Sequence, residues 1–356
     1  MTADANLFAQ QKANRRRSAV LVTIFVLFFA WIGFGGDLAF YLYTLPVDDP
    51  DAPGRAEQAY RHVVPWFGIG ATLLGLGMAL IAWHRGPKQI LWATGAWELI
   101  NASKPEEKKL INVVEEMAIA SGLPRPNIWI VPDKDPNAFA TGTDEHHSHV
   151  AVTQGLLETL DRDELQGVVS HEMAHIQNHD VKLMTLLAAL VGVMALISEG
   201  AWRVMRFGGY AGRRGGGGRS GGGGGRKGGA GALALIVLVV WLISVLIAPV
   251  VSRLLALAVS RKREFLADAT GAQFTRNPGA LASALRKIED AAAPTRAIKR
   301  GTAHLCIADP LGRRVSHKQG FVADILATHP PMAVRVARLK RMAYQYERTG
   351  VLPEAL

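Results

Sequence analysis

The chain has 356 residues, of which 49% are hydrophobic and one is a cysteine, and its formal net charge is +10. A single cysteine, Cys306, excludes an intrachain disulfide and a cysteine-ligated zinc site, so His, Asp or Glu would have to hold any metal. The basic residues gather beside long apolar runs and lack interleaved aromatic residues, which favours anionic lipid headgroups over nucleic acid as their partner.

Two apolar runs near the N-terminus predict membrane helices. Residues 18–36 exceed the 7–15 apolar residues of a signal peptide and are not followed by a small-x-small cleavage site. Residues 63–83 are also long enough to cross about 30 Å of hydrocarbon. The intervening residues 37–62 are acidic, whereas the basic residues lie on the outer flanks: Arg15, Arg16, Arg17, Arg85 and Lys88. By the positive-inside rule, the arm 1–17 and the residues after the second run face the cytoplasm, and the connecting loop is external.

Residues 84–180 have the pattern of a folded soluble segment. Ser103 and Glu106 form an S-x-x-E capping box, which predicts a helix up to about Ser121. Short β-rich runs predict strands at residues 127–131, 138–141 and 149–153. Asp161 and Glu164 cap a further helix with three apolar residues at core-facing spacing: Leu165, Val169 and Ile176.

The rest of the chain alternates between apolar and soluble segments. Residues 181–205 and 232–257 each contain an apolar stretch, and the glycine- and arginine-rich linker 206–231 between them should be flexible. Either both stretches span the bilayer, which leaves a basic loop outside, or they form a hairpin that dips in from the cytoplasm. In both cases, residues 258–356 return to the side of residues 84–180. Helices are predicted at three places in this last segment: about 263–274, about 279–290 and from near Met332.

The central motif is His171-Glu172-Met173-Ala174-His175, an H-E-x-x-H sequence. On a helix, positions four apart lie on one face, so both imidazoles can reach one ion while Glu172 contacts a water on it. A catalytic zinc needs three protein ligands. The continuation with Gly at 178 and His at 181 is excluded by Asn178 and Val181, so the third ligand must come from elsewhere in the chain.

Glu264 is the candidate for the third ligand, since it opens a soluble helix just after the last apolar run. Asp268 follows it by four residues, on the same helix face, where it could accept a hydrogen bond from the second nitrogen of a ligating histidine. The spacing alone equally fits two solvated carboxylates on a helix surface.

Three motifs decide between these interpretations: HEMAHIQNHD at 171–180, SRKREFLADA at 260–269 and THPPMAVRVARL at 328–339. Together they resemble the integral-membrane gluzincin peptidases typified by HtpX, of which the type I CAAX prenyl proteases are more distant members. The stretch NAFATG at 137–142 also looks like that family's edge strand. The glycine-rich insert is the main departure from the family pattern.

The resemblance implies roles for particular residues. His171, His175 and Glu264 would bind zinc, Glu172 would act as catalytic base and Asp268 would support a ligand. His329 and Arg335 would lie near the substrate carbonyl. The substrate strand would pair with five residues: Asn137, Ala138, Phe139, Ala140 and Thr141. Of the other histidines, His146, His147 and His149 are interpreted as a solvated loop rather than a second metal site.

The predicted fold is an α+β membrane protein, with a mainly helical gluzincin catalytic domain, a small β-sheet and about four transmembrane or membrane-embedded helices. By resemblance, the function is that of a zinc endopeptidase with one Zn²⁺ per subunit. It would cleave membrane or misfolded proteins on the cytoplasmic side of the cell (inner) membrane, in protein quality control. The alternatives are a CAAX-type prenyl-protein endopeptidase and an inactive zinc-binding membrane scaffold. The expected partners are protein or peptide substrates and the lipid bilayer.

Overall fold

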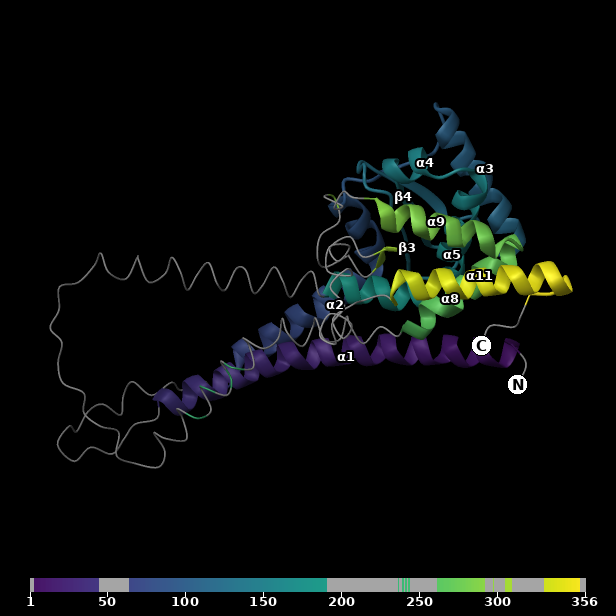
Figure 1. Ribbon diagram of the computed structural model, residues 1–356. Coiled ribbons are helices and arrows are strands. Elements are labelled where there is room, and N and C mark those ends of the chain that lie inside the picture. Colours follow the sequence, from purple (N-terminus) through teal and green to yellow (C-terminus); the bar gives the residue numbers. More distant parts are fainter. Residues whose placement is uncertain are drawn as a thin grey trace, which may run out of the picture. The chain divides into compact units, whose positions relative to one another are not determined.

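The computed structural model in Figure 1 describes residues 3–44, 64–190, 261–291, 305–308 and 330–352, with single positions at 236, 239, 241, 243 and 297. Clustering of its contacts gives two compact units. Unit 1 comprises Met1–Ala19, Ile81–Gly192 and Leu254–Leu356. Unit 2 comprises Val20–Leu80 and Val193–Arg253.

Two long helices carry the first two predicted membrane segments. Within α1 (Ala3–Thr44) and α2 (Trp66–Ala93), the stretches Lys12–Leu38 and Trp66–Ala93 are long and apolar enough to cross a bilayer. Exposed apolar side chains recur on α1 every three or four residues: Val20, Ile24, Leu27, Trp31, Phe34 and Leu38. Such a continuous stripe is unusual on a water-soluble surface and suits contact with lipid tails.

The expectation of a loop from residue 37 onward is wrong for residues 37–44, which continue α1. Asp37 lies within this helix, and its carboxylate accepts a hydrogen bond from the backbone N–H of Gly68 in the first turn of α2, at 2.7 Å. The later membrane predictions, 181–205 and 232–257, fall largely outside the described residues, apart from a helical stretch at 180–190. The linker 206–231 lies wholly outside them.

Unit 1 contains a four-stranded mixed sheet in the order β1-β2-β4-β3. Its strands are β1 (Trp97–Glu98), β2 (Asn127–Val131), β3 (Ala138–Gly142) and β4 (Ser148–Thr153). β2 and β4 are parallel, and the other two pairs are antiparallel. The three predicted strands are confirmed, whereas β1 is too short to leave a periodic signal in the sequence.

Both faces of the sheet are buried, which explains why its strands are almost uniformly apolar. On one face, Ile128, Ile130, Val150 and Val152 belong to the main core with the helices. The opposite face packs in a second cluster formed with the end of α2 and residues 305–306: Trp129, Val131, Phe139, Ala151, Ile90, Leu91 and Cys306. Cys306 is thus a buried, free cysteine in this second cluster.

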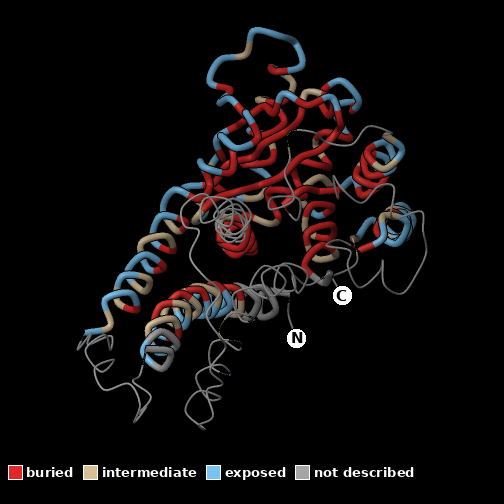
Figure 2. Tube along the Cα trace, turned by 90° about the vertical axis from the view of Figure 1, so that its left-hand side faces the viewer, coloured by how far each residue is buried: buried red, intermediate tan, exposed pale blue. Residues whose placement is uncertain are grey.

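Further helices of unit 1 pack with α5 (Arg162–Gln177) or with one another. They are α3 (Pro105–Ser121), α4 (Gln154–Thr159), α8 (Arg261–Thr275), α9 (Pro278–Asp290) and α11 (Met332–Thr349). α5 contacts α3, α8, α9 and the strands β3 and β4. Figure 2 shows the resulting concentration of buried residues in the strands and the helices around them.

The two predicted capping boxes had different outcomes. The Asp161–Glu164 box is confirmed at the start of α5, with reciprocal bonds of 2.9 and 3.0 Å. The Ser103–Glu106 box is wrong by one position. Pro105 is the first residue of α3, which is a favoured place for proline, and this puts Glu107 at the third helical position. The Glu107 carboxylate accepts from the backbone N–H groups of Ser103 and Lys104.

Candidate metal centre

The two histidines of the H-E-x-x-H sequence lie on one face of α5. The His171 side chain is fully buried and that of His175 is 13% exposed, and their ring centroids are 4.8 Å apart. Capping of α5 at Asp161 and burial of its apolar stripe hold this helix at the centre of unit 1. The imidazoles are therefore presented from a rigid element rather than from a loop.

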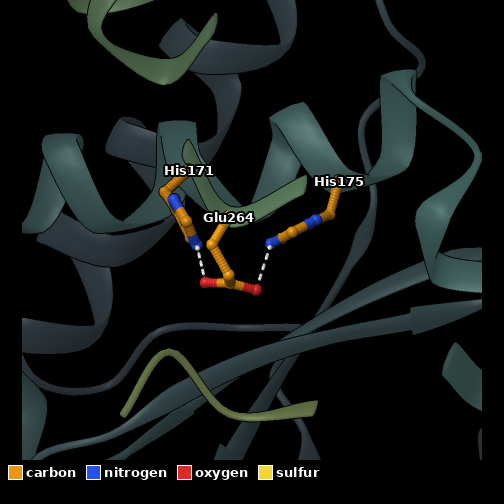
Figure 3. A group of neighbouring side chains, drawn as sticks. All are labelled: His171, His175 and Glu264. Carbon is orange, nitrogen blue, oxygen red and sulfur yellow. Dashed lines mark ion pairs between the residues drawn. The ribbon is translucent and has the colours of Figure 1, made fainter. Parts of the chain in front are cut away.

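Glu264, from the first turn of α8, completes a three-residue group with these histidines (Figure 3). Its two oxygens lie 3.7 Å from His171 Nε2 and 3.6 Å from His175 Nε2. Ligands bound tetrahedrally at 2.0–2.1 Å would be separated by about 3.3 Å. The spacing is thus close to that required for a shared ion, and it is long for direct hydrogen bonds.

A glycine allows α8 to approach α5 closely enough for this arrangement. Gly271 lies two turns after Glu264 on the same helix face, with Asp268 between them. A Cβ atom at Gly271 would lie only 3.0 Å from the backbone nitrogen and 3.1 Å from the Cα of His171. The absence of a side chain at Gly271 therefore sets the depth at which α8 packs against the metal-site helix.

Each histidine is oriented by a separate buried carboxylate. Asp268 Oδ1 lies 2.9 Å from His171 Nδ1, and Asp180 Oδ2 lies 3.2 Å from His175 Nδ1. Both Nδ1 atoms are thus occupied, and both Nε2 atoms face Glu264, as in carboxylate–histidine–metal groups.

Sequence reasoning singled out Asp268 but overlooked Asp180. Asp180 follows His175 by five residues, a spacing that does not share a helix face. It reaches back because α5 ends at Gln177 and His179 adopts a left-handed φ of 55°. The sequence offered one signal for this role of Asp180, namely that an acidic residue directly follows His179 at the end of the motif.

Charge balance in the buried site favours a divalent cation. Among the described residues, four acidic side chains are almost fully buried there: Glu172, Asp180, Glu264 and Asp268. Two buried guanidinium groups of the same described part, those of Arg263 and Arg335, oppose them. With neutral imidazoles, four negative and two positive charges leave two negative charges. Buried charges are expensive unless they are paired, so a doubly charged ion fits this donor set.

The pKa values of the site reflect this crowding. Burial raises the pKa of Glu172 to about 7, against the opposing charge of His175. Burial acts to lower the pKa of His175, but its hydrogen bond to Asp180 and the charge of Glu264 outweigh burial and raise the pKa to about 9. Burial acts to raise the pKa of Asp268, yet the guanidinium of Arg335 holds it at about 2. Glu172 therefore titrates near neutral pH, where a general base is most effective.

Arg335 does not lie as a free donor beside a substrate position. It is fully buried, and its Nε and Nη2 donate to the Asp268 carboxylate at 2.9 and 2.7 Å. Its Nη1 donates to the Ile307 carbonyl at 2.9 Å and lies 3.3 Å from Glu264 Oε2. Its guanidinium thus contacts the site's own carboxylates, and the expected position near a substrate carbonyl stays a prediction. His329 lies outside the described residues.

The expectation that all of residues 137–141 offer a free sheet edge is wrong for Asn137, Ala138 and Phe139. Ile307 N–H donates to the Ala138 carbonyl at 2.9 Å, and Cys306 forms an antiparallel bridge with Phe139. The Asn137 side chain donates to the Ala308 carbonyl at 3.0 Å. Residues 305–308 thus pair with the start of β3, a contact between segments too distant in sequence for local patterns to reveal.

The other histidines do not form a second metal group among the described residues. His147 is exposed and bonded to Asp144 at 2.8 Å. His149 is a strand residue rather than a loop residue, and its Nδ1 accepts a hydrogen bond from the Trp129 indole at 3.2 Å. Burial lowers the pKa of His149 to about 4, so it is a neutral core side chain at physiological pH.

Comparison with known proteins gives consistent matches. Residues 104–343 match the model of peptidase family M48. A Protease HtpX homolog from Thermoanaerobacter pseudethanolicus is 40% identical over 280 residues, which cover 78% of this chain and 86% of the relative. One from Lactobacillus helveticus is 37% identical over 338 residues, which cover 94% and 100%. The crystal structure of S. mikatae Ste24p aligns with a TM-score of 0.40 at 17% identity, over 90% of this chain and 66% of that structure.

We predict that Gly271→Ala weakens metal binding at least tenfold, about the effect expected when support of a ligand is disturbed. The added methyl group would push α8 away from the His171 backbone and withdraw Glu264. Zinc affinity of the purified full-length protein, measured by competition with a chelator, tests this. Gly279→Ala is the matched control, because its Cβ would make only an ordinary 3.5 Å contact. Equal affinity in the two variants would contradict the prediction.

Asp268→Asn should weaken zinc binding by roughly 10–100-fold, because His171 loses the carboxylate that orients it. It should also lower the thermal unfolding temperature, since the buried Arg335 loses its closest charged partner. Asp163→Asn, at an exposed position in the first turn of α5, serves as the control. A variant at position 268 that binds zinc as tightly as the unmodified protein would rule out this role for Asp268.

Proposed function

The chain belongs to peptidase family M48, whose members are metalloproteases, and on that premise we propose that it is a membrane-bound, zinc-dependent endopeptidase. The observation that carries the proposal is the convergence of His171, His175 and Glu264 from two helices onto one buried point. Two imidazoles and one carboxylate are the protein ligands of a common class of catalytic zinc site, which keeps a fourth position open.

Glu172 is the proposed catalytic base. It follows the first ligand on α5, is 1% exposed and accepts a hydrogen bond from the backbone N–H of Ala140. Zinc in this site supplies a Lewis acid, which polarises a peptide carbonyl and makes a water molecule more acidic. The Glu172 carboxylate takes the proton of the attacking water and then delivers it to the leaving amine.

Other residues of the site hold this machinery in place. Asp268 and Asp180 keep the Nε2 atoms of the two histidines turned toward the ion. Arg335 positions Asp268 and Glu264 and neutralises part of their charge. We assign His329 to stabilisation of the substrate oxyanion on the basis of its motif alone. The substrate main chain would lie near Ala140, beside the base.

The proposed location is the cytoplasmic face of the inner membrane, with a multi-pass chain. Residues 1–19 and 81–192 belong to unit 1, while most of the two candidate spans in α1 and α2 belongs to unit 2. The start of α1 and the end of α2 therefore both belong to unit 1. Those ends carry the basic residues that favour the cytoplasm. Misfolded or misassembled membrane proteins are the proposed substrates, which would be bound through main-chain contacts with loose sequence selectivity.

We predict that Glu172→Gln keeps zinc affinity near that of the unmodified protein but lowers casein cleavage by at least about 100-fold, because the amide cannot accept the water's proton. Zinc content and cleavage rate are measured on the same detergent-solubilised preparation. Glu158→Gln, at an exposed position of α4, controls for loss of a carboxylate and should keep full activity. Full activity of the position 172 variant would refute the assignment of the base.

Removal of metal with a chelator should abolish casein cleavage, and addition of Zn²⁺ should restore it, because the three ligands have no catalytic role without an ion. Cleavage that resists chelation would contradict a metallopeptidase.

The same measurements separate the two alternative functions. Zinc binding without cleavage of casein or any other protein would indicate the inactive scaffold. Cleavage confined to a prenylated C-terminal peptide would indicate the CAAX-type enzyme.

A further inference from the structure

The N-terminal helix reaches the metal centre through the buried side chain of Asn14. Asn14, on α1, is 1% exposed and lies 164 residues before Asn178 in the chain. Its Nδ2 donates to Asp180 Oδ1 at 2.7 Å and to the backbone carbonyl of Asn178 at 3.1 Å. Both partners are acceptors, so the two N–H groups of the amide match them and the orientation of the side chain is fixed.

These two bonds act on the segment that orients His175. Asp180 uses its other oxygen, Oδ2, to contact His175 Nδ1 at 3.2 Å. Asn178 is the C-cap residue of α5, one turn after His175. Between them lies His179, whose φ of 55° is a conformation that few residues other than glycine adopt. Asn14 therefore binds both ends of the turn 178–180, and the position of the Asp180 carboxylate depends on this turn.

Arg263 does not by itself explain how Asp180 is held. Its Nη1 lies 3.5 Å from Asp180 Oδ1, at the limit of a hydrogen bond, whereas the amide of Asn14 is 0.8 Å closer to the same oxygen. Arg263 supplies charge, and the short directional bond comes from Asn14.

We propose that Asn14 is a positioning residue of the metal centre, which acts through Asp180 on His175. This part of α1 then completes the site, although it contributes no ligand, and Asn14 lies near the start of the candidate membrane span Lys12–Leu38. This inference rests on the proposed zinc site, but it assigns a role to a segment that sequence reasoning treated only as a basic flank.

The test measures Zn²⁺ affinity of the full-length protein in detergent, by competition with a chelator of known affinity. Asn14→Leu keeps the approximate volume and removes both hydrogen bonds. Asn14→Asp keeps the shape but removes the donor and sets a second carboxylate against Asp180. Both variants should bind Zn²⁺ roughly 10–100-fold more weakly, the usual effect of losing support behind a metal ligand. Ser18→Ala, at a buried position one turn along α1, controls for altered packing of this helix and should keep its affinity.

A double-mutant cycle separates this role from simple docking of α1. Once Asp180→Ala has removed the carboxylate, Asn14→Leu should cause no further loss of Zn²⁺ affinity, because the two residues act in series. Thermal unfolding of the metal-free variants reports the docking contribution separately.

The possible results are distinguishable. Normal Zn²⁺ affinity in both Asn14 variants would overturn the inference and leave the proposed function intact. Additive losses in the double variant would also overturn it, because Asn14 would then act by another route. Failure of the unmodified protein to bind Zn²⁺ would overturn the proposed function and this inference together.

Discussion

The close packing of α8 against α5 is the contact on which the rest of the site depends. Gly271 lets the two backbones approach, and this approach carries Glu264 to the two histidines and Asp268 to the far side of His171. Either helix alone presents an ordinary polar face. Together they place one carboxylate between two imidazoles, beside the core around α5. The chemistry is therefore a property of a helix pair whose members are separated by more than eighty residues of chain.

The site is an electrostatic unit rather than a set of three ligands. Four buried carboxylates would repel one another strongly in a region of low dielectric constant, and two arginines offset only half of their charge. Burial raises the pKa of Glu172. Against the effect of burial, the hydrogen bond to Asp180 and the charge of Glu264 raise the pKa of His175, so both groups tend to retain a proton when no ion is bound. A divalent ion would take the place of those protons, so its affinity should depend on every member of the network.

Local sequence patterns predicted most elements and the histidine pair, and the family resemblance singled out Glu264, but neither revealed the contacts that hold them. The Asp161 cap, the strand at 127–131 and the His171–His175 spacing each depend on neighbours within a few residues, where helix and strand geometry is regular. Asp180 was overlooked because its contact with His175 depends on the left-handed φ of His179. A residue other than glycine gives no sign of that conformation in the sequence. Asn14 and residues 305–308 act across more than 160 residues, and no periodicity connects such positions. The contacts of Arg335 with Asp268 and Glu264 were not foreseen because its motif gives no information on burial.

Anomalous X-ray scattering at the zinc absorption edge, measured on crystals of the metal-loaded full-length protein, would test the central claim most directly. The account predicts one strong peak per chain, within about 2.0–2.2 Å of His171 Nε2, His175 Nε2 and a carboxylate oxygen of Glu264. A peak bound by other residues, or a zinc held by the two histidines with Glu264 turned away, would contradict it.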